Sequence, residues 1–150
     1  MKELKCPGEM DLSGNSLFLG GGISSCPQWQ WAMVDLLGET DLVLVNPRRN
    51  DFDATDPTMT RKQIEWEHKY LARVTARMFW FPSETLCPIT LFELGKFIGG
   101  PDPLFVGCHP DYQRKADLQI QLELARPQDC EISYSLIELA GRIARWSEKP

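Results

Sequence analysis

Two acidic residues lie near the start of a predicted helix, at a place where proteins with parallel sheets often bind ligands. The apolar stretch 78–81 predicts a strand, the turn after it holds Glu84, and the next helix begins at Pro88 and presents Glu93 about one turn later. In an open α/β sheet, ligands bind between the carboxyl end of a strand and the following helix. A carboxylate among apolar residues is costly to bury unless it has a partner or a function. Glu93 is therefore a candidate catalytic carboxylate. Alternatively, Glu93 faces solvent on an amphipathic helix, and Glu84 is a solvated acid in the turn.

A glycine run follows the first predicted strand and could form part of a ligand site. Gly20, Gly21 and Gly22 let the backbone turn sharply and approach a ligand closely, with a plain strand-to-helix turn as the alternative. The run matches neither the G-x-G-x-x-G fingerprint of dinucleotide-binding folds nor a P-loop. Trp29 follows this loop and Trp80 lies on a predicted buried strand. Either indole could stack on a nucleobase, with core packing as the alternative.

Polar side chains also follow the second and fourth predicted strands. Asn46 ends the second strand and could read the edge of a base, or could simply terminate the strand. Arg48 and Arg49 could bind a 5′-phosphate through bidentate hydrogen bonds, or could be solvated loop charges. His109 belongs to a second polar cluster after the fourth strand, for which a proline-fixed turn is the alternative.

The spacing of apolar residues predicts alternating strands and helices around these candidates. Strands are expected at residues 16–20, 41–45, 78–81 and 104–106, and helices at 27–38, 60–76, 88–98 and from 135 onward. Residues 113–124 fit both periods, although their composition favours a helix. This order predicts a flavodoxin-like or Rossmann-like three-layer α/β sandwich with a mostly parallel sheet of four to five strands. Residues 1–14 lack periodicity and are expected to form a flexible arm before a single domain over residues 15–150.

Two helix starts and one loop carry more specific signals. Thr60 with Gln63, and Ser135 with Glu138, match the capping-box pattern of a helix N-terminus. Ile64 is expected on the inner side of the helix that Thr60 would begin. The connection over residues 47–60 is longer than the usual length of about two to six residues, so it could form a lid over a site.

Composition narrows the class of protein. The 150 residues contain 16 Lys and Arg against 21 Asp and Glu, for a net charge of −5, which argues against a nucleic-acid polymer as partner. No apolar run approaches the roughly 18 residues that span a bilayer, and no signal peptide is visible, so we expect a cytoplasmic protein without membrane contact. Five scattered cysteines favour free thiols, and the residue pattern predicts neither a metal site nor a cofactor.

Five segments resemble the nucleoside 2-deoxyribosyltransferase-like family in their order and spacing. Glu93-Leu94-Gly95 after a strand resembles the nucleophile motif of the family, and the other segments lie at residues 17–23, 45–49, 63–67 and 106–110. No single segment is specific alone. Together the segments span roughly residues 16 to 124. Three glycines stand at Gly20 to Gly22, where the family more often has Ala-Gly followed by a small residue or proline.

The resemblance implies roles for several of these residues. It assigns Glu93 as nucleophile and places Glu67 on the preceding helix with its carboxyl toward the same pocket, to orient Glu93 or to act as acid and base. Lys69 or Arg73 could instead pair with an exposed Glu67. It also implies that the glycine loop lines the pocket. The region around His109 would complete the site of a neighbouring subunit, so a homodimer or higher homo-oligomer is expected.

The three glutamates suit cleavage of the bond between an anomeric carbon and a base nitrogen. If Glu67, Glu84 and Glu93 meet at one sheet edge, their repulsion separates their pKa values, so one carboxylate can attack while another carboxylic acid assists the leaving base. Glu84 would then hold the base or the ribose. We therefore expect an N-glycoside hydrolase or a transferase acting on a nucleoside or a nucleoside 5′-monophosphate. The alternatives are a non-catalytic nucleotide-sensing module and a TIR-like enzyme that cleaves NAD.

Overall fold

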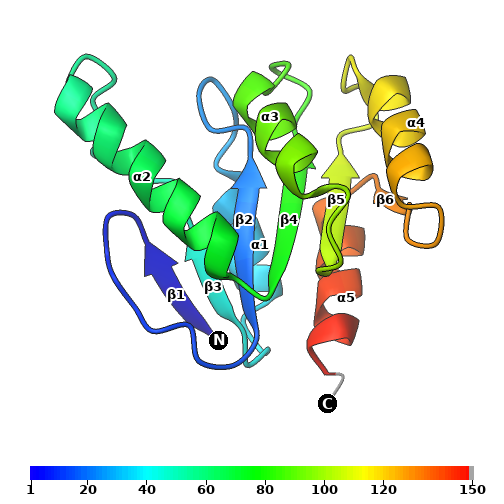
Figure 1. The fold of residues 1–150 in the computed structure, drawn as a ribbon, viewed down its shortest axis with the longest axis horizontal. Coiled ribbons are helices and arrows are strands. Elements are labelled where there is room, and N and C mark those ends of the chain that lie inside the picture. The colour runs from blue at the N-terminus through cyan, green and yellow to red at the C-terminus, as the bar shows by residue number, and fades with distance from the viewer. Residues whose placement is uncertain (149–150) are drawn as a thin grey trace.

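A six-stranded parallel sheet forms the centre of the protein. The computed structural model describes residues 1–148, and its strands follow the order β1-β3-β2-β4-β5-β6 (Figure 1). The strands are β1 (Lys2–Lys5), β2 (Ser16–Gly21), β3 (Val43–Asn46), β4 (Ala76–Phe81), β5 (Leu104–Cys108) and β6 (Ile132–Ser133). Every neighbouring pair is parallel. Parallel pairing brings the carboxyl ends of all these strands to one edge, where ligands bind in such sheets.

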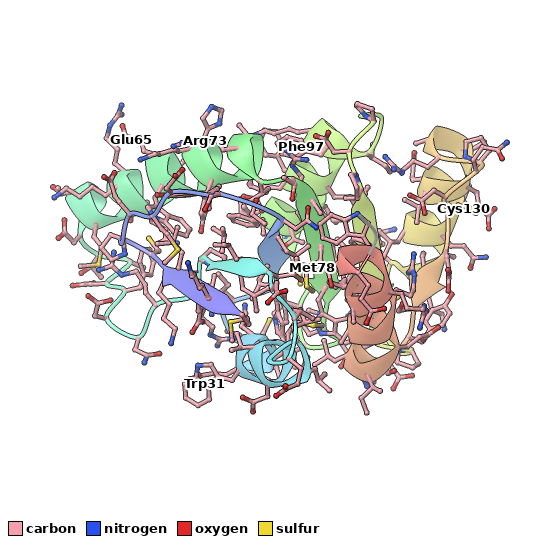
Figure 2. All side chains as sticks on the ribbon, turned by 90° about the horizontal axis from the view of Figure 1, so that it is seen from below. Trp31, Glu65, Arg73, Met78, Phe97 and Cys130 are labelled. Atoms are coloured by element: carbon pink, nitrogen blue, oxygen red, sulfur yellow. The ribbon has the colours of Figure 1, made fainter. Side chains whose placement is uncertain are left out.

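Helices cover both faces of the sheet. They are α1 (Trp29–Leu36), α2 (Pro57–Arg73), α3 (Pro88–Phe97), α4 (Lys115–Ala125) and α5 (Leu136–Ser147). Figure 2 shows α2 and α3 on one side of the sheet and α1 and α5 on the other, with Met78 between the layers. This arrangement confirms the flavodoxin-like, three-layer α/β sandwich. The sheet has six strands, slightly more than the expected four to five.

The two strands outside the predicted ranges are short. Residues 1–14 do not all form a loose arm, because Lys2–Lys5 is strand β1, which pairs with β3 in parallel. Only Leu4 of this strand is buried, and its charged neighbours hide the usual apolar signal of a strand. Charged residues are typical of edge strands, since they discourage pairing with other chains. Strand β6 has only two residues, too few to show a period.

Of the four predicted helix starts, two agree with the structure and two differ. Helix α1 begins at Trp29, two residues after the predicted start at Pro27. Pro88 begins α3, and the Ser135 hydroxyl accepts a hydrogen bond from the backbone N–H of Glu138, as a capping box requires. Helix α2 begins at Pro57 instead of after Thr60, because the Asp56 carboxylate accepts hydrogen bonds from the N–H groups of the first turn. An aspartate cap followed by proline is as good a start signal as the capping box. Residues 115–125 form a helix, as their composition favours.

Successive side chains along each strand point to opposite faces of the sheet and form two separate hydrophobic cores. Phe18, Phe79 and Phe81 point to the face covered by α2, α3 and α4, whereas Met78 and Trp80 point to the face covered by α1 and α5. This alternation follows from the period of two in a strand. Within residues 1–148, no helix combines the length and the apolar composition needed to cross a bilayer.

Candidate active site

A cavity of about 380 Å³ opens at the carboxyl ends of β2 and β4, between helices α2 and α3. Three segments supply most of its wall: the glycine loop after β2, the face of α2 that looks toward α3, and the turn after β4 with the first half of α3. The lining residues from these three segments include Gly20, Gly21, Gly22, Gln63, Ile64, Glu67, Thr85, Cys87, Ile89 and Glu93. The cavity therefore joins segments that the topology brings to one sheet edge.

Glu93 reaches this cavity from the middle of α3. The helix begins at Pro88, directly after Cys87, which adopts a left-handed conformation with φ of 50° and so turns the chain sharply out of the sheet. Burial raises the pKa of Glu93 to about 7, the negative charge of Glu67 adds to the shift, and Lys96 opposes it. Near neutral pH, this carboxyl group is therefore close to half ionised, and strongly shifted pKa values of this kind cluster at functional sites.

Glu67 lines the same cavity from α2 and is held by a hydrogen-bond network. The amide nitrogen Nε2 of Gln63 donates to Glu67 Oε1 at 2.7 Å and to the Pro47 carbonyl at 2.9 Å. The Gln63 Oε1 atom accepts a hydrogen bond from the Cys6 thiol at 2.9 Å. Burial raises the pKa of Glu67, and the bond from Gln63 opposes this shift because it favours the ionised form.

Gln63 has a different role from the one that the sequence suggests. It is not part of a capping box at the start of α2, because its side chain is buried and fully bonded within the site. The i, i+4 spacing between Gln63 and Glu67 is the one signal in the sequence that could have revealed the pair. The contact with Cys6 comes from the far end of the chain and could not be read from spacing.

The glycine loop approaches the cavity where larger residues would not fit. A Cβ atom at Gly20 would lie 2.6 Å from the Phe79 ring, and one at Gly21 would overlap the Trp29 indole. The Trp29 Nε1 atom donates to the Gly22 carbonyl at 2.9 Å, so the indole supports the loop from behind. Trp29 is buried and lies outside the cavity wall, as does Trp80 in the core of the opposite face.

Three other predicted site residues also lie outside the cavity wall. Glu84 is exposed in the turn after β4 and does not join the other two glutamates. Asn46 is buried, and its side-chain nitrogen donates to Glu3 at 2.9 Å. His109 is half exposed after β5, where its Nδ1 atom accepts from the Asp111 backbone N–H. Sequence order alone did not separate these residues from the pair Glu67 and Glu93.

A family model covers the part of the chain that forms this cavity. The model of the family described as nucleoside 2-deoxyribosyltransferase like matches residues 14–112 of this chain. The chain belongs to this family. Among curated proteins, no relative matches the chain. The matched residues run from just before β2 to just after β5 and so include the glycine loop, Glu67 and Glu93.

The two adjacent arginines of this family member have separate surroundings. The Arg48 guanidinium donates to the carbonyls of Pro27, Ile23 and Cys26 and to the Gln30 side chain, at distances of 2.6 to 3.3 Å. It therefore ties the loop before α1 to the end of β3. Arg49 instead lines the cavity, with Nε and one terminal nitrogen each 2.7 Å from an Asp51 carboxylate oxygen. Of the two arginines, Arg49 is the one that borders the cavity.

Apolar side chains at the mouth of the cavity were not predicted as site residues. Ile64 is 60% exposed on α2, not on the inner side of that helix as expected, and Ile89 on α3 is 66% exposed. Phe52, in the loop between β3 and α2, is 42% exposed and lines the same cavity. In residues 1–148, no cluster of three or more His, Cys, Asp or Glu side chains could hold a metal ion.

Proposed function

We propose that this protein breaks the N-glycosidic bond of a nucleoside or nucleoside 5′-monophosphate, with Glu93 as nucleophile and Glu67 as its acid and base partner. One observation carries the proposal: two half-buried carboxyl groups from α2 and α3 share one cavity, and burial together with their mutual repulsion brings the pKa of Glu93 to about 7. Family membership supports nucleosides as the substrate class.

The reaction would proceed in two displacements. Because the two carboxyl groups repel each other, the pair holds one proton near neutral pH, and in the reactive form this proton is on Glu67. Ionised Glu93 attacks the anomeric carbon, the bond from that carbon to the base breaks, and the bonding electrons pass to the base nitrogen, which accepts the proton from Glu67. The product of this step is a glycosyl ester on Glu93. Water or a second base, deprotonated by Glu67, then attacks the same carbon and regenerates the Glu93 carboxylate. The acceptor decides whether the outcome is hydrolysis or transfer.

The walls of the cavity suit the parts of such a substrate. Phe52, Ile64 and Ile89 offer apolar surface for a planar base, while the two carboxyl groups are available to the sugar. A volume of about 380 Å³ falls within the range of small-molecule sites. Arg49 would hold a 5′-phosphate by exchanging part of its pairing with the exposed Asp51 carboxylate.

The pKa shift predicts how turnover depends on pH. Glu93 must be ionised to attack, and its pKa is raised to about 7. Turnover should therefore fall as pH drops below about 7, where an unperturbed glutamate would still be ionised. The Glu67–Gln63 hydrogen bond keeps the second carboxyl group oriented across this range.

The direct test is a substrate panel. Purified protein is incubated with ribonucleosides, 2′-deoxyribonucleosides, their 5′-monophosphates and NAD, and free base or nicotinamide is measured by chromatography, with and without a second base as acceptor. Glu93→Gln should lower kcat by about a thousandfold or more, because a neutral amide cannot form the ester. The matched control is Glu123→Gln, which changes an exposed acid on α4 outside the cavity.

Two results would contradict the proposal. One is full activity of Glu93→Gln, which would remove Glu93 as nucleophile. The other is saturable nucleotide binding by calorimetry without turnover of any compound, which would indicate a sensing module. Release of nicotinamide alone would instead indicate an NAD-cleaving enzyme.

We also propose that the protein acts as a homo-oligomer in which His109 serves a neighbouring subunit. His109 lies outside its own cavity and is half exposed, so it is free to contact another copy. Light scattering after size exclusion measures the oligomeric state. A monomer that turns over substrate at its full rate would contradict this proposal.

A further inference from the structure

Two cysteine thiols from separate loops meet behind the glycine loop. A Cβ atom built on Gly22 would lie 2.7 Å from Cys87 Sγ and 2.8 Å from Cys26 Sγ, so both sulfur atoms crowd the same point. Thr85 Oγ1 also lies 3.3 Å from Cys87 Sγ and 4.0 Å from Cys26 Sγ. A side chain at position 22 would collide with both sulfur atoms, so the glycine is what lets the two thiols approach the loop this closely.

The two thiols differ in access and in their relation to the cavity. Cys26 is partly exposed, whereas Cys87 is 4% exposed and lines the cavity. Cys26 belongs to the loop that leads from β2 to α1, and Cys87 directly precedes the first residue of α3. The pair therefore bridges two walls of the site that are far apart in the sequence.

We propose that Cys26 and Cys87 form a thiol-modification site that closes to an intramolecular disulfide when a low-molecular-weight disulfide is the oxidant. The Cys26 thiolate attacks one sulfur of the oxidant, forms a mixed disulfide and expels one thiol. The Cys87 thiolate then attacks Cys26 Sγ and expels the second thiol. Overall, two protein thiols and one small disulfide give one protein disulfide and two small thiols, so atoms and electrons balance.

The surroundings set the speed of this exchange. Burial raises the pKa of both thiols, and the charge of Glu84 adds to the rise. At Cys26, hydrogen bonds with Thr85 and Cys87 and the charge of Arg48 oppose it. Because only the thiolate attacks, the exchange should be slow at pH 7 and should accelerate as pH rises. The proximity of the second thiol favours closure over a persistent mixed disulfide.

Closure of the disulfide should change the active site, an effect that rests on the proposed function. The bond would draw the start of α3, which carries Glu93, toward the loop that begins at Gly22. Small displacements of catalytic groups have large kinetic effects, so kcat/KM for the nucleoside substrate should fall about tenfold or more. Reduction with dithiothreitol should restore it.

The experiment compares reduced protein with protein treated with glutathione disulfide at pH 8.5. The oxidised wild-type chain should lose the mass of two hydrogen atoms, and proteolytic mapping should recover a peptide pair that joins Cys26 to Cys87. Its melting temperature should rise by several degrees, because the bond constrains the unfolded chain. The Cys87→Ser variant should retain the mixed disulfide on Cys26, because no second thiol displaces it. The Cys26→Ser variant should form neither a mixed disulfide nor a bond to Cys87.

Cys130→Ser is the matched control, because this thiol is also partly exposed but lies near the C-terminal end of the chain, outside the cavity. It should oxidise like the wild type. Two results in the wild-type chain would overturn the proposal: a stable glutathione adduct on Cys26, or no bond to Cys87. Neither result depends on whether the protein turns over a nucleoside. Mapped closure without any nucleoside turnover would leave the thiol site intact and would overturn only the proposed function.

Discussion

The two faces of the sheet are covered by helices of similar kind, yet only one of them is sealed. Helices α1 and α5 lie on the same face of the sheet and contact each other. Fully buried side chains such as Met33, Leu139 and Ile143 fill this face. On the opposite face, α2 and α3 stand on either side of the cavity and present Ile64 and Ile89 to solvent.

This difference separates stability from chemistry. The α1 and α5 face excludes water and supplies apolar burial. The α2 and α3 face leaves room for a ligand and contains the partly buried carboxyl groups of Glu67 and Glu93, whose raised pKa values reflect a cost of burial. We expect the buried carboxyl groups to make the α2 and α3 face less stable than an apolar face of the same packing would be. Substitutions on the α1 and α5 face should therefore change mainly stability, and substitutions on the α2 and α3 face should change mainly turnover.

Next to the loss expected for Glu93→Gln, the largest effect should come from Glu67→Gln on the open face. Loss of the acid and base should lower kcat about a hundredfold to ten thousandfold. Because the charge of Glu67 raises the pKa of Glu93, its removal should also move the acidic limb of the remaining activity to lower pH. Turnover measured from pH 5 to pH 9 checks both effects.

Glu65→Gln is the control on the same helix, since Figure 2 shows Glu65 pointing away from the sheet. It should leave the rate and the pH profile unchanged. An acidic limb that stays at its wild-type pH in Glu67→Gln would show that the two carboxyl groups do not interact.

On the sealed face, Leu139→Ala should lower the free energy of unfolding by about 3 kcal/mol, because Leu139 is fully buried and its removal leaves a cavity. The kcat/KM of the folded fraction should not change. Urea denaturation gives the first quantity and initial rates at low temperature give the second. Ile137→Ala, on the same helix but 73% exposed, should change stability by less than about 0.5 kcal/mol. A loss of kcat/KM in Leu139→Ala would break the comparison between the faces.

Glu93→Gln should gain stability relative to the wild type as pH rises. In the wild type, unfolding lowers the pKa of Glu93 from about 7 to its ordinary value of 4.5, so the carboxyl group loses its proton on unfolding between these pH values. Wild-type stability therefore falls across that range, and the variant lacks this loss. The difference in unfolding free energy should shift by about 3 kcal/mol in favour of the variant between pH 4 and pH 8. A constant difference in urea titrations at the two pH values would argue against a raised pKa.

The smallest expected effect concerns Arg49. Charge-assisted hydrogen bonds to a phosphate should give the wild type about a tenfold preference in kcat/KM for a 5′-monophosphate over its nucleoside. Arg49→Ala should remove this preference and leave nucleoside turnover largely intact. Arg73→Ala, which removes the same charge at the exposed end of α2, is the control. Equal kcat/KM for both substrates in the unmodified protein would show that Arg49 serves only its ion pair with Asp51.

The sequence predicted those features that depend on local signals. The apolar periods located the central strands, and a strand followed by Pro88 and Glu93 led to one wall of the cavity. The family resemblance placed Glu67 toward the same pocket, and Glu67 does line it. Strand β1 was missed because a single buried leucine among charged residues has no period.

Features that depend on contacts between distant residues could not be predicted. Glu84 and Glu93 are close in sequence, yet the turn directs Glu84 to solvent. Arg48 and Arg49 are neighbours, yet backbone carbonyls surround one and the cavity borders the other. The bonds from Gln63 to Cys6 and Pro47 require the folded sheet, because they join residues from three separate segments.

The position of β1 has a practical consequence for recombinant work. Strand β3 is buried along its whole length, and one of its two edges is covered only by the short strand at the start of the chain. A preparation trimmed by a few residues at its N-terminus would expose an unpaired apolar strand edge, which is a template for self-association. Trimming past residue 6 would also remove the Cys6 contact to Gln63, so the same proteolytic damage would disturb both the sheet edge and the candidate site.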